Sequence, residues 1–154
     1  MPRIISSRQV RAIAALMFVA TSWIALSAKE TTVEELKARL SSANPGERPR
    51  LCLEIAQKQL DAADKSYLAV ESEKGQAALT DVVAFSELAR DYAIQSRKHQ
   101  KQIEIEVRKM IRKLIDLKNT VSHDDQLAVQ DTIDRLQKVR DDLLFSMFPK
   151  GEKK

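Results

Sequence analysis

The chain has 154 residues, which suits a single domain, and its low content of glycine (3) and proline (4) favours helices over sheets. Its one cysteine, Cys52, excludes an intramolecular disulfide. The formal net charge of +4 would suggest a nucleic-acid partner, but the N-terminal segment accounts for most of that charge.

Residues 1–28 have the pattern of a secretory signal peptide. Three arginines precede an uncharged, mostly apolar run over residues 12–28, which ends in small residues. Cleavage after Ser27 fits the small-residue rule better than cleavage after Ala28. An uncleaved membrane anchor is the alternative, because 17 residues are near the lower limit for spanning a bilayer.

Setting this segment aside changes the charge argument. The segment contains three arginines and no acidic residue, so the rest of the chain carries 23 Lys+Arg against 22 Asp+Glu, a net charge of +1. A nearly neutral domain has no overall electrostatic attraction for nucleic acid. We therefore expect no nucleic-acid partner.

Two helices are predicted in the first half of the remaining chain. Thr32 and Glu35 form a capping box that opens a short helix ending near residue 43. After a turn at residues 44–49, a second amphipathic helix begins at Pro49 and is predicted to end at Gly75, in a left-handed cap. If the chain folds back there, the start of this helix lies level with Ser96.

The longest pattern, residues 77–121, contains no glycine or proline. Its two apolar stripes are out of phase by one residue, on either side of a polar segment at residues 97–102. We expect one continuous helix of about 65 Å. A break within residues 97–102 is the alternative. A last helix follows the turn at residues 119–123, with Ser122 as its cap.

The predicted fold class is therefore all-α. Antiparallel helical hairpins pack along a long central helix, with four helices after the signal peptide, or form a compact four-helix bundle if the central helix breaks near residues 97–102. The predicted domain spans residues 29–148, and residues 149–154 form a disordered basic tail.

The second half of the central pattern is strongly basic. Residues 97–118 hold eight Lys+Arg against three acidic residues, a net charge of +5. Folding the last helix back at Ser122 brings acids level with these bases, so we expect ion pairs rather than a phosphate-binding helix; each exposed pair contributes about 0–1 kcal/mol. The expected pairs are Lys118 with Asp125, Arg112 with Asp131, Lys109 with Asp134 and Lys101 with Asp142.

Motifs that carry chemistry are missing from the sequence. It has two histidines, and His99 has no acidic residue at the helical spacing of four. We find no nucleophile elbow, phosphate-binding loop or paired cysteines. The sequence therefore predicts no enzymatic activity, no catalytic residues, no cofactor and no metal. Cys52 is expected to be a small, partly buried hydrophobe, with an intermolecular disulfide as the alternative.

The last helix ends in a cluster that is apolar on more than one face. Such a cluster is either buried or a binding surface. In the first interpretation it meets the start of the second helix (Leu51, Leu53 and Ile55), and the short first helix covers the junction. In the second it contacts a protein partner or a second copy. The candidate partner-binding residues are Leu144, Phe145, Met147 and Phe148, with Arg97, Lys98 and Lys101 as a polar rim.

The hairpin from Pro49 to Gln95, in which Lys74-Gly75 precedes Ala77, Ala78, Val82 and Phe85, resembles a tetratricopeptide-like helical pair. Aligning Ala78 with the central alanine of the repeat puts Phe85 where a small residue is expected. The predicted helices are also longer than those of the repeat, and no second copy occurs. The resemblance implies protein–protein interaction, without identifying groove residues.

Together these features predict an exported, non-enzymatic α-helical interaction or scaffold protein of the bacterial cell envelope, periplasmic or secreted. Its partner is expected to be a protein or a second copy, with membrane contact only through an uncleaved N-terminus. The alternatives are a membrane-anchored periplasmic protein and, third, a protein that binds an anionic polymer or lipid headgroups through the rim.

Overall fold

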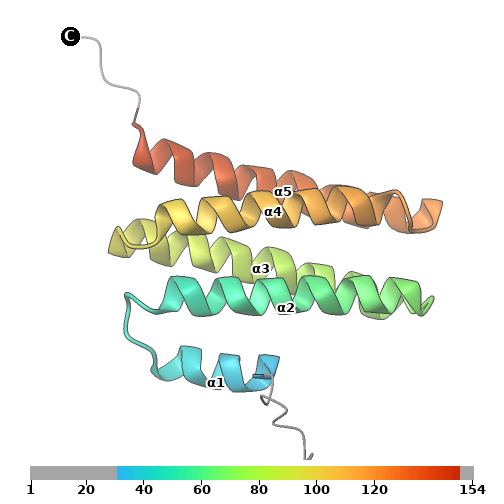
Figure 1. The fold of residues 1–154 in the computed structure, drawn as a ribbon, viewed down its shortest axis with the longest axis horizontal. Coiled ribbons are helices and arrows are strands. Elements are labelled where there is room, and N and C mark those ends of the chain that lie inside the picture. The colour runs from blue at the N-terminus through green and yellow to red at the C-terminus, as the bar shows by residue number, and fades with distance from the viewer. Residues whose placement is uncertain (1–30, 150–154) are drawn as a thin grey trace, which may run out of the picture. The chain divides into compact units, whose positions relative to one another are not determined.

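The computed structural model describes residues 31–149, in which there are five helices and no strand (Figure 1). The predicted signal peptide, and the predicted tail beyond residue 149, lie outside the described residues. The all-α prediction is confirmed. The helices are α1 (Val33–Ser42), α2 (Arg48–Leu68), α3 (Ser72–Ser96), α4 (Gln100–Lys118) and α5 (His123–Met147).

The four long helices form an antiparallel bundle. α2 pairs with α3 and α4 pairs with α5, while α3 also lies against α5 and α2 against α4; α1 packs on α2. We call one end of the bundle the link end, because it holds the α3–α4 link (Arg97–His99) together with the α1–α2 loop and the last turn of α5 (Figure 1). The other end, the turn end, holds the α2–α3 and α4–α5 turns.

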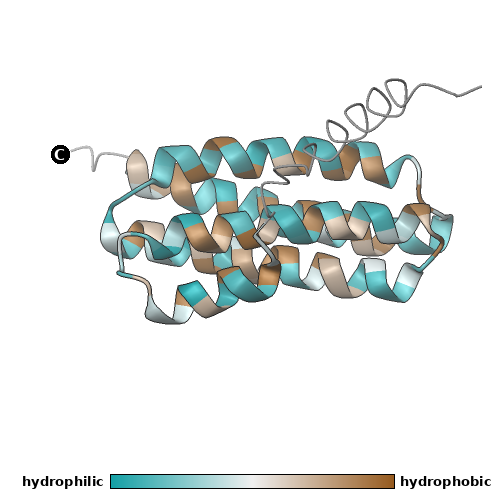
Figure 2. Cartoon of the chain, turned by 60° about the horizontal axis from the view of Figure 1, so that its bottom comes forward, coloured by the Kyte–Doolittle hydropathy of each residue, from teal (hydrophilic) through white to brown (hydrophobic). Residues whose placement is uncertain are grey.

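Apolar residues recur along every helix between polar ones (Figure 2), and burying them holds the bundle together. The main core cluster draws residues from α2, α3, α4 and α5. A smaller cluster forms where α1 covers the start of α2, and its buried members are Leu36, Leu51 and Ile55.

Two helix starts have the caps that the sequence predicts. The Glu35 backbone N–H donates to the Thr32 hydroxyl at 3.2 Å, and the Glu35 carboxylate accepts from the Thr32 N–H at 3.2 Å. At the start of α5, the Asp125 N–H donates to the Ser122 hydroxyl at 3.3 Å. Each cap satisfies a backbone donor that has no partner within its helix.

The continuous helix expected over residues 77–121 is wrong. The chain breaks at Arg97–His99, so the compact bundle, the alternative expectation, is the observed one. Arg97 and His99 have φ angles of 54° and 64°, in the left-handed region that costs about 1–2 kcal/mol per non-glycine residue. The break is favoured nonetheless, because it lets α4 bury a seam of Ile103, Val107 and Leu114, each 0% exposed, inside the bundle.

The predicted end of the second helix at Gly75 is also wrong. α2 ends at Leu68, and Val70, with φ 60°, occupies the left-handed position. Gly75 instead lies inside α3 and is buried against the Tyr67 ring, where an added Cβ would come within 2.7 Å of the ring. The glycine thus serves close packing and not chain reversal. The hairpin register moves accordingly, and Gln59 of α2 hydrogen-bonds Asp81 of α3 at 2.8 Å.

The four ion pairs expected between α4 and α5 do not form within residues 31–149. Acids of α5 face α3 instead, since Asp142 accepts from Arg90 at 2.9 Å. Lys118 donates to Gln130 at 2.6 Å, and Lys109 bonds its own helix through Glu106. The expected register was close, since Arg140 of α5 bonds Glu104 of α4 at 3.1 Å, but this ion pair is not one of the four expected.

Asp125 joins the start of α5 to the start of α3 at the turn end. Its side chain is buried, at 5% exposure, and accepts hydrogen bonds from Ser72 (2.8 Å), Gln76 (3.1 Å) and Ser122 (2.7 Å). These bonds, from Ser122 first and then Ser72, hold the pKa of Asp125 below its ordinary value. The carboxylate therefore stays ionised and ties the α4–α5 hairpin to α3.

We expect Asp125→Ala to lower the free energy of unfolding by about 1–3 kcal/mol at neutral pH, because three hydrogen bonds to a buried, ionised acceptor are lost. Urea unfolding monitored by circular dichroism measures this loss. A lowered pKa stabilises the fold above the ordinary pKa of aspartate and is lost as pH falls, so the difference from wild type should shrink below about pH 4. Asp124→Ala, at an exposed neighbour in the same turn, is the control and should cost about 0.5 kcal/mol or less.

Cys52 is 0% exposed, and burial raises the pKa of its thiol to about 11, against the lowering effect of Arg48. The thiol therefore packs as a small hydrophobe and is protonated near neutral pH. A maleimide at pH 7 should leave the native protein unlabelled and add one label per chain in urea, as measured by intact mass. Labelling of native protein at the rate of a free thiol would contradict the burial.

Candidate interaction surface

The last turn of α5 and the residue that follows it present two exposed aromatic side chains. Phe145 is 65% exposed and Phe148 is 71% exposed, while Leu144 and Met147 are half-buried. We call these four residues the aromatic tip. α5 reaches this far because Leu143, at 0% exposure, still packs in the core, and the helix ends when Phe148 takes a non-helical backbone conformation.

The first of the two interpretations, in which the cluster meets the start of α2 and the short first helix covers that junction, is wrong, because neither α1 nor α2 packs against α5. α1 packs on α2, where Leu36 meets Leu51 and Ile55, and Leu53 belongs to the main core. The start of α2 is thus covered without help from α5. In contrast, no other part of residues 31–149 covers Phe145 or Phe148, which stay 65% and 71% exposed.

A hollow of about 520 Å³ lies beside the tip. It is lined by Ile94, Arg97, Gln100, Ser146 and Met147, from the end of α3, the start of α4 and the end of α5. The Gln100 side-chain amide holds this arrangement together, because it donates to the Ser146 hydroxyl at 3.1 Å and to the Ala93 carbonyl at 3.4 Å. An apolar tip thus stands next to a hollow with a guanidinium on its wall.

Only part of the predicted rim meets the tip. Arg97 shares the hollow with Met147. Lys98 lies over the α1–α2 loop instead, where its Cδ is 3.2 Å from the position a Cβ would take on Gly46. Lys101 is exposed on the first turn of α4. Within residues 31–149 none of the three side chains forms an ion pair, so their charge is available to solvent or to a ligand.

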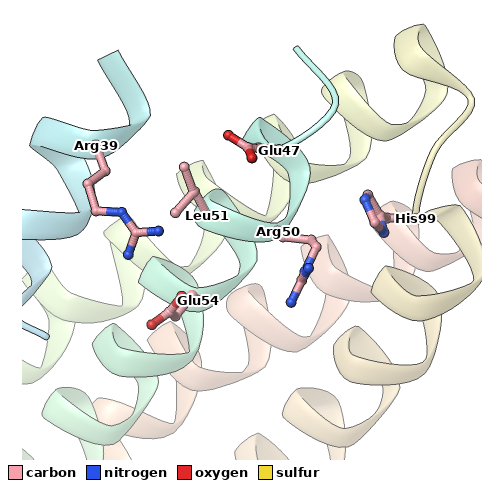
Figure 3. A pocket seen from close by; sticks show the side chains of 6 residues that line it. All are labelled: Arg39, Glu47, Arg50, Leu51, Glu54 and His99. Carbon is pink, nitrogen blue, oxygen red and sulfur yellow. The ribbon is translucent and has the colours of Figure 1, made fainter. Parts of the chain in front are cut away.

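A second hollow, of about 190 Å³, lies on the other side of the link and was missed by sequence reasoning. Figure 3 shows its side chains coming from α1, α2 and the link. Two arginines and two glutamates balance in charge, and within the described chain none of these four forms an ion pair. The residues lie in three separate elements, so no local pattern marks the hollow. Its lining is Arg39, Glu47, Arg50, Leu51, Glu54 and His99.

The buried carboxylate of Glu104 is a structural group. It accepts from Arg108 at 2.7 Å and from Arg140 at 3.1 Å, and its exposure is 5%. Burial raises the pKa of Glu104, but the two arginine hydrogen bonds outweigh burial and hold it below the ordinary value. The ionised group joins α4 to α5. No cluster of three or more potential metal ligands occurs in residues 31–149.

No helix between residues 31 and 149 is both long and apolar enough to cross a membrane. No protein-family model matches the sequence, and no curated protein or solved structure is significantly similar to it.

Proposed function

We propose that this chain is an exported, non-enzymatic helical protein of the bacterial cell envelope that binds a protein partner, or a second copy, through the aromatic tip. The observation that supports the proposal is the exposure of Phe145 and Phe148, at 65% and 71%, in the last turn of α5 and at the residue that follows it. The export part rests on the signal-peptide pattern of residues 1–28.

Burial of these two rings would contribute substantially to binding. Covering an exposed phenylalanine contributes about 1.5–3 kcal/mol, and aromatic residues are enriched at protein interfaces. The hollow beside the tip gives a partner side chain a place to insert. Arg97, which lines it, can donate hydrogen bonds to a carboxylate or a carbonyl of the partner. An apolar centre with a cationic edge is the usual composition of a protein-binding surface.

A non-enzymatic role is proposed because the sequence offers no nucleophile motif, phosphate loop or metal-ligand spacing. His99 does line a hollow with acidic and basic neighbours, but Arg39, Glu47 and Arg50 are exposed on its wall. Many enzymes close their active sites against water, which strengthens the electrostatic interactions inside. An open, charge-balanced surface suits recognition better than proton transfer.

Binding of an anionic polymer or lipid headgroups is the second candidate. It is favoured by the absence, within residues 31–149, of ion pairs to Arg97, Lys98 and Lys101. The two candidates differ in their response to salt. Binding through these cations should weaken steeply between 50 and 200 mM salt, whereas binding through the aromatic tip should change little.

We expect Phe145→Asp with Phe148→Asp to abolish partner binding without unfolding the protein, because both side chains are exposed and the variant keeps the core. The measurement is photo-cross-linking in intact cells from a reactive residue at Asp141, one turn before Phe145 on the same helix face. Wild type should give one specific adduct, with a partner or a second copy, and the variant none.

The matched control is Leu68→Asp with Leu127→Asp, at positions 74% and 79% exposed. It adds the same charge at the turn end and should leave the adduct unchanged. Both variants should keep the wild-type free energy of unfolding within about 0.5 kcal/mol per substitution. Gross unfolding of the Phe145/Phe148 variant would instead assign the two rings to the core.

Export predicts that the protein recovered from the envelope begins at Ala28. Intact mass measures this directly. Trp23 is the only tryptophan of the chain, so the cleaved protein should also show no tryptophan fluorescence. Retention of Trp23 in native material would support the membrane-anchored alternative over the cleaved one.

A further inference from the structure

The link between α3 and α4 lacks the features that normally stop a helix. Residues 95–102 contain no glycine or proline and consist mainly of Gln, Arg and Lys, which are good helix formers. Arg97 and His99 nevertheless adopt left-handed conformations, and no side chain caps the start of α4. Local preference thus favours a helix where the structure breaks it.

The α2–α3 turn shows what a well-satisfied reversal looks like in the same molecule. There the N–H groups of Val70 and Glu71 donate to the carbonyls of Tyr67 and Ser66, at 3.0 and 2.8 Å. At the link, the Arg97 N–H has a 3.3 Å bond to the Ile94 carbonyl. The Lys98 N–H reaches only the Ser96 hydroxyl, also at 3.3 Å. Straightening would give residues 98–100 the helical carbonyl partners that they lack.

The contacts that join the two hairpins do not depend on the link. Arg90 of α3 bonds Asp142 of α5 at 2.9 Å, and Arg135 of α5 bonds Glu87 of α3 at 2.9 Å. The α2–α4 contact includes a 3.1 Å bond from Gln57. The apolar core between the hairpins is likewise built from residues far from the link in sequence. A second copy of the chain can supply every one of these groups.

We propose that the chain exchanges its α4–α5 hairpin with a second copy, forming a domain-swapped dimer in which residues 72–118 become one continuous helix. The helix would be about 70 Å long. Each α2–α3 hairpin then packs against the α4–α5 hairpin of the other copy through the same contacts as in the monomer. The two states differ mainly at residues 97–99, so the dimer forms as protein concentration rises.

The test varies the link alone, in the full chain refolded at several hundred micromolar and sized by light scattering after gel filtration. Arg97→Ala with His99→Ala keeps the left-handed strain in the monomer and favours the helix, so it should raise the dimerisation constant severalfold. Arg97→Gly with His99→Gly relieves the strain in the monomer and should lower the constant about ten-thousandfold, because about tenfold is lost at each of the two positions in each of the two chains that combine.

Val70→Gly is the matched control. Val70 has the same left-handed conformation, with φ 60°, but lies in the α2–α3 turn, which the exchange does not open. It should leave the ratio of monomer to dimer unchanged. If the alanine pair does not fold, the glycine pair and Val70→Gly still test the exchange. The glycine pair should form less dimer than wild type, whereas Val70→Gly should form as much.

Cross-linking distinguishes exchange from surface docking. Chains carrying Glu87→Cys alone are refolded together with chains carrying Arg135→Cys alone, and the dimer fraction is treated with a short bis-maleimide. Exchange places the two cysteines side by side between copies and should give a covalent heterodimer. Wild type, with only the buried Cys52, should give none.

Two results would overturn the exchange: wild type and the alanine pair both remaining monomeric at all concentrations, or a dimer that does not cross-link between positions 87 and 135. The inference does not rest on the aromatic tip. Phe145→Asp with Phe148→Asp should leave the exchanged dimer intact. A result that contradicts the exchange can therefore be told apart from one that contradicts the proposed partner surface.

Discussion

The three-residue break at Arg97–His99 is the constraint on which a bundle built from a single chain depends. Without it, α4 would continue away from α3, and the seam of Ile103, Val107 and Leu114 would leave the core. Local terms oppose the break, since both left-handed residues carry side chains and α4 begins without a cap. Burial provides the free energy that stabilises the break. Three large aliphatic side chains contribute several kcal/mol in total, which is more than the strain of two left-handed residues costs.

The two capped helix starts, of α1 and α5, could be predicted from the sequence, whereas the ends of α2 and α3 could not be fixed from it, for a physical reason. A cap such as Thr32 with Glu35 is decided within four residues, so its pattern is complete in the sequence. The ends of α2 and α3 are decided by packing over long distances. Gly75 was expected to reverse the chain, but the Tyr67 ring needs its lack of a side chain inside α3. A glycine in the sequence does not by itself show whether it reverses the chain or allows close packing inside a helix.

The part of the candidate surface that lies on a single helix could be predicted from the sequence, and the part that joins several segments could not. An apolar cluster on more than one face of the last helix pointed to Phe145 and Phe148, and both are exposed. The rim required the relative placement of three segments, and of its three cations only Arg97 lines the hollow beside the tip. The hollow at His99 joins α1, α2 and the link, and sequence spacing carries no information on such a meeting (Figure 3).

The two ends of the bundle hold the hairpins together in different ways. At the turn end, the buried Asp125 carboxylate binds Ser72 and Gln76 of α3, a tie that needs no particular connection between the hairpins. At the link end, Gln100 and Ser146 belong to the α4–α5 hairpin, whereas Arg97 follows α3. In an exchanged dimer the hollow beside the aromatic tip would therefore be assembled from two chains. Exchange would thereby rebuild the candidate surface with the same residue types, and its only new element would be the continuous helix that residues 77–121 favour locally.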